Sequence, residues 1–292
     1  MNKRLMNRLH ELKVPRSDMS KPALFITNDD GIEAPGIQEL IRQLNIEGFP
    51  LFVLAPSTEQ SATGMRISVR KKLKVTNRQD IADKLQSDQN IPLKMYSLDG
   101  SPCDCVIAAL DGGIHILEPE LMPTMCISGV NQGPNISVDI MHSGTVSAAR
   151  ESALYGLPSI AVSLATYEHS NFEYSVKGAI EVMQSCLDFL PKVPSDFLRT
   201  NGSKSVIEMS SNSESIRANF ALGNIFLNLN APVRWNGDFN TVSLGSRWYR
   251  NAIKSHELDD GSMAFEVGAA EIINEEIPGT DCFSVNSAEY AI

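Results

Sequence analysis

Two adjacent aspartates, Asp29 and Asp30, are the residues of this sequence best suited to chemistry, because they place two carboxylates side by side. Neighbouring carboxylates repel each other, and each raises the pKa of the other unless a cation or several hydrogen-bond donors neutralise them. The pair therefore indicates either a bound cation or a simple turn, since Asp is a common turn residue and Gly31 supplies a permissive backbone. The rest of the chain has to decide between these interpretations.

Three polar loops follow predicted strands and carry the other candidate groups. The short apolar runs at 23–27, 51–56 and 124–128 are typical of strands buried on both faces of a parallel sheet. In such sheets, ligands bind beyond the carboxyl ends of the strands. We therefore expect the loops after these strands to meet at one rim. The three loops are 28–36, 55–68 and 129–145.

Oxygen atoms in these loops could hold a hard divalent cation, for which we expect Mg²⁺ or Mn²⁺. Asp29 and Asp30 supply the negative charge, while Ser61 and Asn131 can add neutral oxygens. Such a site polarises a phosphoryl group and activates water, so phosphoester hydrolysis becomes feasible near neutral pH. The sequence has no His-x-x-x-His or paired cysteine site of the kind that zinc prefers.

The segment 142–145, His-Ser-Gly-Thr, leads into a predicted helix and has two interpretations. The backbone N–H groups of Ser143, Gly144 and Thr145 would be unpaired at a helix start, where a phosphate binds readily. Alternatively, Ser143 or Thr145 only caps the helix. The pattern favours neither. Asn28 and Gly31 are expected to shape the turn that presents the two aspartates.

The composition excludes several classes of function. The chain has 292 residues and a formal charge of −10, which argues against a general nucleic-acid or anionic-membrane binder. It contains no G-x-x-x-x-G-K-[ST], G-x-G-x-x-G or G-x-S-x-G motif. No apolar run approaches the about 20 residues of a membrane span, so we expect a cytoplasmic protein. Five cysteines suit a reducing compartment, with Cys103 and Cys105 as buried thiols rather than metal ligands.

Alternating strands and helices predict an α/β fold in which helices cover a largely parallel sheet. Pro35 is expected to begin the first helix after the aspartates. Further helices are predicted at 102–110, ending at Gly112-Gly113, at about 145–155 and at 173–190; further strands at 159–163 and 224–230; an exposed loop or insertion at 199–219; and hairpins within 241–268.

We divide the chain into three parts. Residues 1–20 form an N-terminal extension, which faintly resembles an organellar presequence but is interpreted as a short frayed terminus. Residues 21–195 are expected to form the α/β catalytic core. Residues 196–292 form a smaller C-terminal part that contributes one strand near 224–230 to the core sheet.

Five blocks, in this order and spacing, resemble the SurE survival proteins, which are metal-dependent phosphatases of nucleoside monophosphates. The blocks are TNDDGIEAPGI (27–37), APSTEQSATG (55–64), DGSPCDCV (99–106), SGVNQGPN (128–135) and HSGTVSAARE (142–151). The resemblance implies a Rossmann-like core and a C-terminal part that exchanges elements between subunits of a homodimer or homotetramer. It also implies nucleoside 5'-monophosphates as substrates, with 3'-monophosphates and polyphosphate as further possibilities. From the charge, we expect no nucleic-acid polymer or membrane as partner.

The resemblance also assigns roles to residues. The metal ligands would be Asp29, Asp30, Ser61 and Asn131, with Asp29 and Asp30 also catalytic. Groups on the phosphate side would be Asn135, Ser143, Gly144 and Thr145. We expect Asp29 to be the general base, with formation of an aspartyl-phosphate on Asp29 as the alternative.

Three positions depart from the family pattern. His142 stands where the family usually has Tyr, Ser101 where it commonly has Thr, and Ser152 where it usually has Gly. None of them removes an implied metal ligand, so they bear on substrate preference more than on activity. Those at His142 and Ser152 are the only reason to keep a second hypothesis, a nucleotide- or metabolite-binding protein without turnover on the same fold.

Overall fold

The computed structural model describes residues 21–292 apart from 88, 169–170, 191–211 and 269–270. The predicted extension at 1–20 and most of the predicted insertion at 199–219 therefore lie outside the described residues. No helix within the described ranges is long and apolar enough to cross a membrane.

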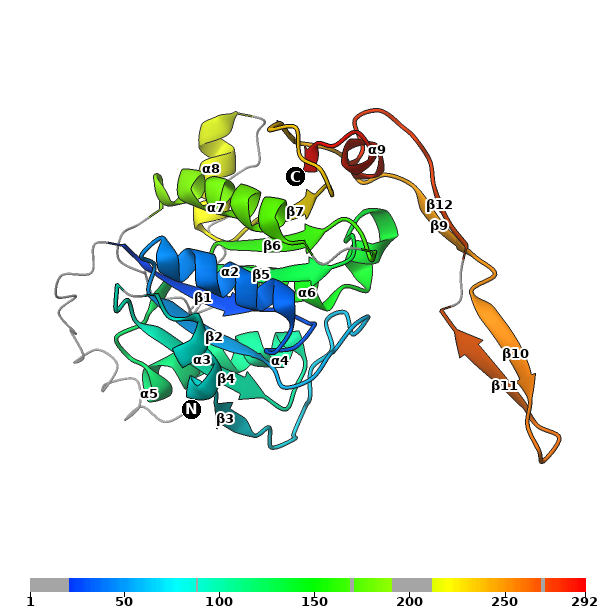
Figure 1. Cartoon of the computed structure of the whole chain (residues 1–292), viewed down its shortest axis with the longest axis horizontal. Coiled ribbons are helices and arrows are strands. Elements are labelled where there is room, and N and C mark those ends of the chain that lie inside the picture. Colours follow the sequence, from blue (N-terminus) through cyan, green and yellow to red (C-terminus); the bar gives the residue numbers. More distant parts are fainter. Residues whose placement is uncertain (1–20, 88, 169–170, 191–211, 269–270) are drawn as a thin grey trace.

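One nine-stranded sheet runs through the centre of the molecule, and most of its neighbouring strands are parallel (Figure 1). Its strand order is β3-β4-β2-β1-β5-β6-β7-β13-β8. Along the chain the strands are β1 (Ala23–Thr27), β2 (Leu51–Pro56), β3 (Val75–Asn77), β4 (Leu93–Leu98), β5 (Pro123–Gln132), β6 (Ser159–Leu164), β7 (Leu227–Ala231), β8 (Phe239–Asn240) and β13 (Tyr290–Ala291). The fold class expected from the sequence is confirmed.

The order of the strands reverses between β1 and β5. From β1 the chain first builds outward through β2 and β4, and it then returns to the other side of β1 to add β5, β6 and β7, all in parallel. A crevice at the carboxyl ends of the strands forms at such a switch point, where open α/β sheets bind their ligands. Asp29 and Asp30 directly follow β1, and Asn131 is near the end of β5.

Helices cover both faces of the sheet, and each face has its own apolar core. One core contains residues of α2, α3 and α7, while the other contains residues of α4, α5 and α6. The helices are α2 (Pro35–Ile46), α3 (Gln79–Leu85), α4 (Pro102–Ala108), α5 (Ile114–Leu117), α6 (Gly144–Leu154), α7 (Glu173–Leu187), α8 (Ser213–Ala221) and α9 (Asp281–Asn286), with helical turns η1 (Ala109–Gly113) and η2 (Ser137–Met141).

The predicted end of the helix at Gly112-Gly113 is confirmed, because Asp111 and Gly112 have non-helical backbone angles, but a short helix that was not predicted follows. Helix α4 passes into the wide turn η1, in which Gly112 adopts a φ of 114°, and the chain then resumes a helical path in α5. Ile114 packs into the same apolar core as α4, so burial carries the helical path past the glycines. The chain thus kinks at Asp111 and Gly112, and α5 is a separate short helix after the kink.

The C-terminal part differs from the prediction in two places. The end of the predicted loop at 199–219 is helical, because Asn212 accepts a hydrogen bond from the backbone N–H of Ser215 as the cap of α8, and Phe220 is buried in the core. Residues 241–244 do not form a strand and contribute only a single bridge, between Ser243 and Thr280. The strand expected at 224–230 is confirmed as β7, which begins three residues later.

A two-stranded arm projects from the body of the molecule (Figure 1). Its base is the antiparallel pair β9 (Arg247–Arg250) and β12 (Glu271–Asn274), and its tip is the hairpin of β10 (Ile253–Glu257) and β11 (Met263–Val267). The hairpin confirms the prediction for the second half of 241–268. From here on, residues 247–274 are called the arm.

Candidate active site

A tight turn directly after β1 presents the two aspartates. The side-chain amide of Asn28 donates a 2.8 Å hydrogen bond to the carbonyl oxygen of Gly31, and Gly31 has a φ of 94° that favours glycine. This is the turn expected from the sequence. Asp29 lies inside the protein with an exposure of 3%, whereas Asp30 is partly exposed.

The Asp29 carboxylate lies against the first turn of α6. The Thr145 hydroxyl donates to Asp29 Oδ1, and the backbone N–H groups of Gly144 and Thr145 also lie against this carboxylate. Burial nevertheless raises the pKa of Asp29, because the lost hydration outweighs the effect of these donors. A Cβ atom at Gly144 would come within 2.7 Å of Asp29 Cβ, so only glycine lets the helix start this close.

The Asp30 carboxylate faces the end of β5. Its Oδ2 accepts a 3.1 Å hydrogen bond from the backbone N–H of Gln132. Burial, the neighbouring Asp29 charge and the nearby Glu59 charge together raise the pKa of Asp30 to about 7. The site thus concentrates negative charge, and a cation would relieve the repulsion.

The surroundings of the acids fit a divalent cation with oxygen ligands. Neither Asp29 nor Asp30 forms an ion pair within the described residues, so no protein cation balances them. The described residues also contain no group of three or more His, Cys, Asp or Glu side chains placed to hold a metal ion on their own. Neutral oxygens would therefore have to complete the ligand set. Mg²⁺ accepts such a combination of carboxylate and neutral oxygen ligands.

The two neutral candidates differ in how they are placed. Asn131 is on β5 next to Gln132, and its side-chain amide donates a 2.8 Å hydrogen bond to the carbonyl of Gly133, which fixes the orientation of its amide group. The Ser61 hydroxyl donates to Glu59 at 2.8 Å and is exposed. The structure thus brings Asn131 to the strand end beside Asp30. The hydroxyl of Ser61, in contrast, is bonded to Glu59 and not to either aspartate.

Hydrogen bonds join the three predicted loops at one rim. The backbone N–H of Gln60 donates to the carbonyl of Asp29 at 2.7 Å, and that of Gly64 donates to the carbonyl of His142 at 2.8 Å. These bonds connect the loop after β2 with both other loops. The convergence expected from the strand order is confirmed.

A capping box fixes the same rim from the side of α4. The Ser101 hydroxyl accepts from the Asp104 N–H, while the Asp104 carboxylate accepts from the N–H of Ser101 at 2.8 Å. The other Asp104 oxygen accepts from the N–H of Ser68 at 2.8 Å and so holds the loop after β2. Because serine caps a helix as threonine does, the departure at Ser101 preserves this function.

The groups implied for the phosphate side have other partners in the structure. Ser143 caps α6 by accepting from the N–H of Val146 at 3.0 Å, so the capping interpretation is confirmed for its hydroxyl. The amides of Gly144 and Thr145 serve Asp29. Asn135 is buried, and its side-chain amide donates to the Ser163 hydroxyl at 2.7 Å rather than to either aspartate.

Two participants were missed by the sequence analysis. Glu59 adds a third negative charge near Asp30, and Gln132 supplies the backbone donor to it. Glu59 lies in the APSTEQSATG block, where the presence of an acid two residues before Ser61 was the available signal. A backbone donor such as that of Gln132 has no residue-type signature.

The two remaining departures from the family pattern differ in solvent exposure. The side chain of His142 is exposed, so it can meet a ligand at the rim. Ser152 is fully buried beside the Cys126 thiol, so it belongs to the packing of α6 on the sheet. Cys103 and Cys105 are buried free thiols in α4, as predicted, and burial raises the pKa of Cys103 to about 12.

Comparison with known proteins gives one family. Residues 24–254 match the family model described as "Survival protein SurE". A relative named 5'-nucleotidase SurE from Geobacter sulfurreducens is 32% identical over 273 residues, which cover 92% of this chain and 86% of the relative. The crystal structure of a SurE protein from Aquifex aeolicus superposes with a TM-score of 0.64 at 25% identity, covering 92% of this chain and 91% of that one.

Other relatives match over shorter stretches. Proteins named 5'-nucleotidase SurE from Natranaerobius thermophilus and Flavobacterium psychrophilum are 39% and 40% identical over 51% and 58% of this chain. These alignments span 54% and 62% of the length of those relatives, so this chain covers little more than half of each.

Proposed function

Because the chain belongs to the family of SurE survival proteins, we propose that it is a divalent-metal-dependent phosphatase that hydrolyses nucleoside 5'-monophosphates to nucleoside and phosphate. The observation that carries the proposal is the pair Asp29 and Asp30, two acids at the switch point of the sheet that form no ion pair among the described residues. The name 5'-nucleotidase, borne by relatives at 32–41% identity, supports the choice of substrate.

Asp29, Asp30 and Asn131 would hold the cation, together with Ser61 once its hydroxyl turns away from Glu59. When bound there, a divalent cation such as Mg²⁺ or Mn²⁺ supplies positive charge to the substrate phosphate and makes water a better nucleophile near neutral pH. The raised pKa values of both aspartates support this assignment, because they mark a site that lacks positive charge.

The two aspartates are suited to different tasks. The Asp29 carboxylate is held by the Thr145 hydroxyl and two backbone amides, which fix its orientation but leave it 3% exposed. Asp30 is more accessible, and within the described residues the only recorded protein donor to its carboxylate is Gln132, at Oδ2. We therefore favour Asp30 over Asp29 as the group that takes the proton of the attacking water.

The start of α6 acts on the phosphate mainly through its field. The amides of Gly144 and Thr145 are engaged with Asp29, but the positive end of the helix still points at the rim and favours an anion there. Ser143 and Asn135 complete the phosphate side in this proposal. The buried bond between Asn135 and Ser163 keeps Asn135 at the ends of β5 and β6.

Four further attributes belong to the same proposal. Hydrolysis of 3'-monophosphates and of polyphosphate would use the same phosphate site. The protein would act in the cytoplasm, which agrees with five free, buried thiols. It would assemble as a homodimer or homotetramer through residues 196–292. It would bind neither a nucleic-acid polymer nor a membrane, in line with its formal charge of −10.

Phosphate release from a panel of nucleoside monophosphates tests the proposal. The wild type, Asp30→Asn and the control Asp259→Asn are compared with Mg²⁺, with Mn²⁺ and with a chelator. Asp259 is exposed in the turn between β10 and β11, far along the chain from the rim. We expect Asp30→Asn to lower kcat/KM by about 100-fold or more and Asp259→Asn to leave it unchanged.

Two results would overturn this function. If the wild type binds a nucleotide but releases no more phosphate than Asp30→Asn with any metal, the protein is a binding protein without turnover. If the wild type retains full activity in chelator, the dependence on a divalent cation is wrong. Trapping a phosphorylated Asp29 would replace attack by water with the aspartyl-phosphate route.

A further inference from the structure

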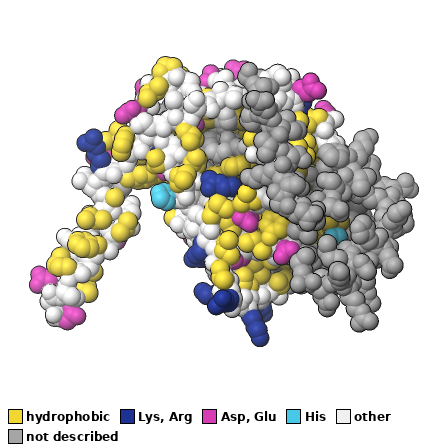
Figure 2. All heavy atoms as spheres, turned by 180° about the vertical axis from the view of Figure 1, so that it is seen from behind, with side chains coloured by type: hydrophobic (Ala, Val, Ile, Leu, Met, Phe, Trp, Pro, Cys, Tyr) yellow, Lys and Arg dark blue, Asp and Glu magenta, His cyan; other side chains and the backbone are white. Residues whose placement is uncertain are grey.

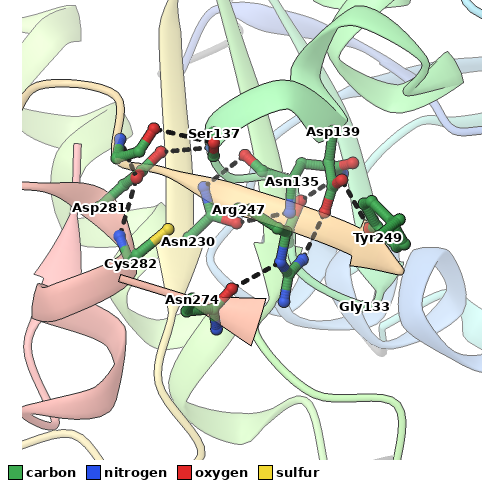
Figure 3. Close-up of polar contacts among 12 residues, drawn as sticks. Gly133, Asn135, Ser137, Asp139, Asn230, Arg247, Tyr249, Asn274, Asp281 and Cys282 are labelled. Atoms are coloured by element: carbon green, nitrogen blue, oxygen red, sulfur yellow. Dashed lines mark hydrogen bonds and ion pairs between the residues drawn. The ribbon is translucent and has the colours of Figure 1, made fainter. Parts of the chain in front are cut away.

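A buried ion pair joins the base of the arm to the loop that begins α6 (Figure 3). Arg247, the first residue of β9, donates from Nη1 to the Asp139 carboxylate, and the two side chains are only 6% and 11% exposed. The Tyr249 hydroxyl donates to the other Asp139 oxygen at 2.6 Å. Two side chains of the arm thus donate hydrogen bonds to the two oxygens of the Asp139 carboxylate.

The guanidinium of Arg247 is itself held in place. Its Nε donates to Asn274 Oδ1 at 2.9 Å, and Asn274 is the residue directly opposite Arg247 in the β9–β12 pair. A planar guanidinium bonded at two edges has a defined orientation, which a flexible ammonium group would lack. The cross-strand pair therefore aims Arg247 at Asp139.

Asp139 passes this restraint on to the candidate active site. Its backbone carbonyl accepts from the N–H groups of His142 at 3.0 Å and Ser143 at 2.9 Å. Ser143 is the cap of α6, and the next two residues supply the donors that surround the Asp29 carboxylate. Hydrogen bonds, joined by the short backbone segment 139–145, therefore connect the arm to one of the two catalytic acids.

We propose that Arg247 is a positioning residue for the phosphatase reaction: by holding Asp139, it fixes the start of α6 and thereby the orientation of Asp29. This inference rests on the proposed function for the identity of the reaction. Arg247 is more than one hundred residues from Asp139 in the sequence, yet it can affect the reaction rate. A small displacement of a catalytic group such as Asp29 lowers the rate by a large factor.

Hydrogen bonds to Asp281 hold the beginning of η2 independently of the ion pair. Asp281 accepts from the N–H groups of Ser137 and Gly245 at 2.8 Å and 2.7 Å, so the beginning of η2 is attached to the body near α9 without Arg247. Loss of the ion pair should therefore free the end of η2 and the start of α6 while the beginning of η2 stays attached.

Arg247→Met and the matched control Arg250→Met test the proposal in the full-length protein. Arg250 lies on the same strand and is exposed. Both variants are measured by hydrogen exchange of the peptide that spans 140–146 and by steady-state phosphate release, after size-exclusion chromatography confirms an unchanged assembly state. Arg247→Lys, which keeps the charge but loses the planar fork, is the conservative variant.

We expect Arg247→Met to lower kcat by about tenfold or more with KM within about threefold, because positioning acts on the reaction more than on nucleotide binding. Exchange in 140–146 should become faster, Arg247→Lys should recover part of kcat, and Arg250→Met should match the wild type. If Arg247→Met fails to fold, the variant Asp139→Asn/Arg247→Met, which buries no unpaired charge, takes its place with the same expectations.

The proposal is wrong if the Arg247 variant keeps the wild-type kcat and exchange rate. It is also wrong if exchange in 140–146 rises no more than in the rest of the chain, because the expected loss of global stability alone would have that effect. If the wild type releases no phosphate, the proposed function fails, and the exchange of 140–146 still decides whether Arg247 positions this segment.

Discussion

The rim around Asp29 and the arm differ most clearly in how they bury their side chains. At the rim, β1 and β6 are buried along their whole length, and the loops after the strands bond to one another. In the arm, every residue of β10 is exposed, and Phe265 and Val267 of β11 are 64% and 78% exposed. Apolar side chains run along the arm in the space-filling view (Figure 2).

Contacts within one chain thus hold the rim together, whereas the tip of the arm leaves apolar side chains exposed. A two-stranded hairpin is at best marginally stable alone, and a row of exposed apolar side chains marks an interaction surface. The comparison supports the proposal that residues 196–292 assemble two or four copies. The ion pair of Arg247 and Asp139 is where the two regions meet.

Breaking this ion pair gives the largest expected change in stability. Arg247→Met leaves the Asp139 carboxylate buried without its partner, which should lower the free energy of unfolding by roughly 3–5 kcal/mol. Urea denaturation at one fixed protein concentration measures the loss. Arg250→Met, on the same strand but exposed, should stay within about 0.5 kcal/mol of the wild type. Equal losses in both variants would show that β9 itself, and not the ion pair, holds the arm to the rim.

The Asp30 carboxylate should cost the metal-free protein stability at neutral and alkaline pH. Its pKa in the folded protein is about 7, against the ordinary 3.8, so the folded state holds a proton that the unfolded chain has already lost between these values. Stability therefore falls as the pH rises from about 4 to 7 and then levels off. In chelator, Asp30→Asn should be more stable than the wild type by roughly 2 kcal/mol at pH 8, after allowance for solvent screening.

Chemical denaturation at pH 4.5, 6 and 8 measures this difference. It should be near zero at the lowest pH and largest at pH 8. Asp259→Asn in the arm is the control, because this exposed carboxylate should show no such trend. A difference between Asp30→Asn and the wild type that stays constant with pH would contradict the raised pKa.

The parts of the rim that the sequence predicted are those with a local signal. Continuous apolar runs marked β1, β2, β5 and β6, and polar residues after them marked the loops. Pro35 marked the start of α2, where it stands at the first helical position. Because parallel strands bring their carboxyl ends to one edge, these local signals were enough to bring Asp29, Asp30 and Asn131 together.

The parts that could not be predicted depend on partners distant in sequence. Asp139 and Arg247 are 108 residues apart, and no sequence motif around either residue indicates that they form an ion pair. The strand β4 was not predicted because Lys94 and Ser97 interrupt its apolar run. Its position next to β2 nevertheless buries most of its residues. The helix α8 was interpreted as a loop since two of its three buried residues, Ser215 and Asn219, are polar and only Phe220 is apolar.

The hydroxyl of Thr145 should contribute to the rim by a smaller amount. Thr145→Val removes the donor to Asp29 but keeps the shape of the side chain, and we expect a loss of roughly 1–2 kcal/mol in the free energy of unfolding. Ser147→Ala in the same helix is the matched control, because the buried Ser147 hydroxyl forms no hydrogen bond with the described residues. Thermal and urea denaturation should show that Ser147→Ala is neutral or stabilising. If both variants lose the same amount, packing of α6 and not the bond to Asp29 explains the effect.

Polar substitutions at the tip of the arm should leave the fold of the subunit nearly unchanged. Phe265 and Val267 point to the same face of β11, so the variant Phe265→Ser/Val267→Ser should alter the free energy of unfolding by less than about 0.5 kcal/mol at low protein concentration. Sedimentation should show a weaker association of subunits, by about tenfold or more in Kd, because the apolar face is lost. Glu266→Ser, on the opposite face and in an exposed pair with His256, is the control and should change neither quantity. If the Phe265 variant associates as the wild type does, the tip of the arm is not the assembly surface, and the contrast between a self-contained rim and a partner-dependent arm does not hold there.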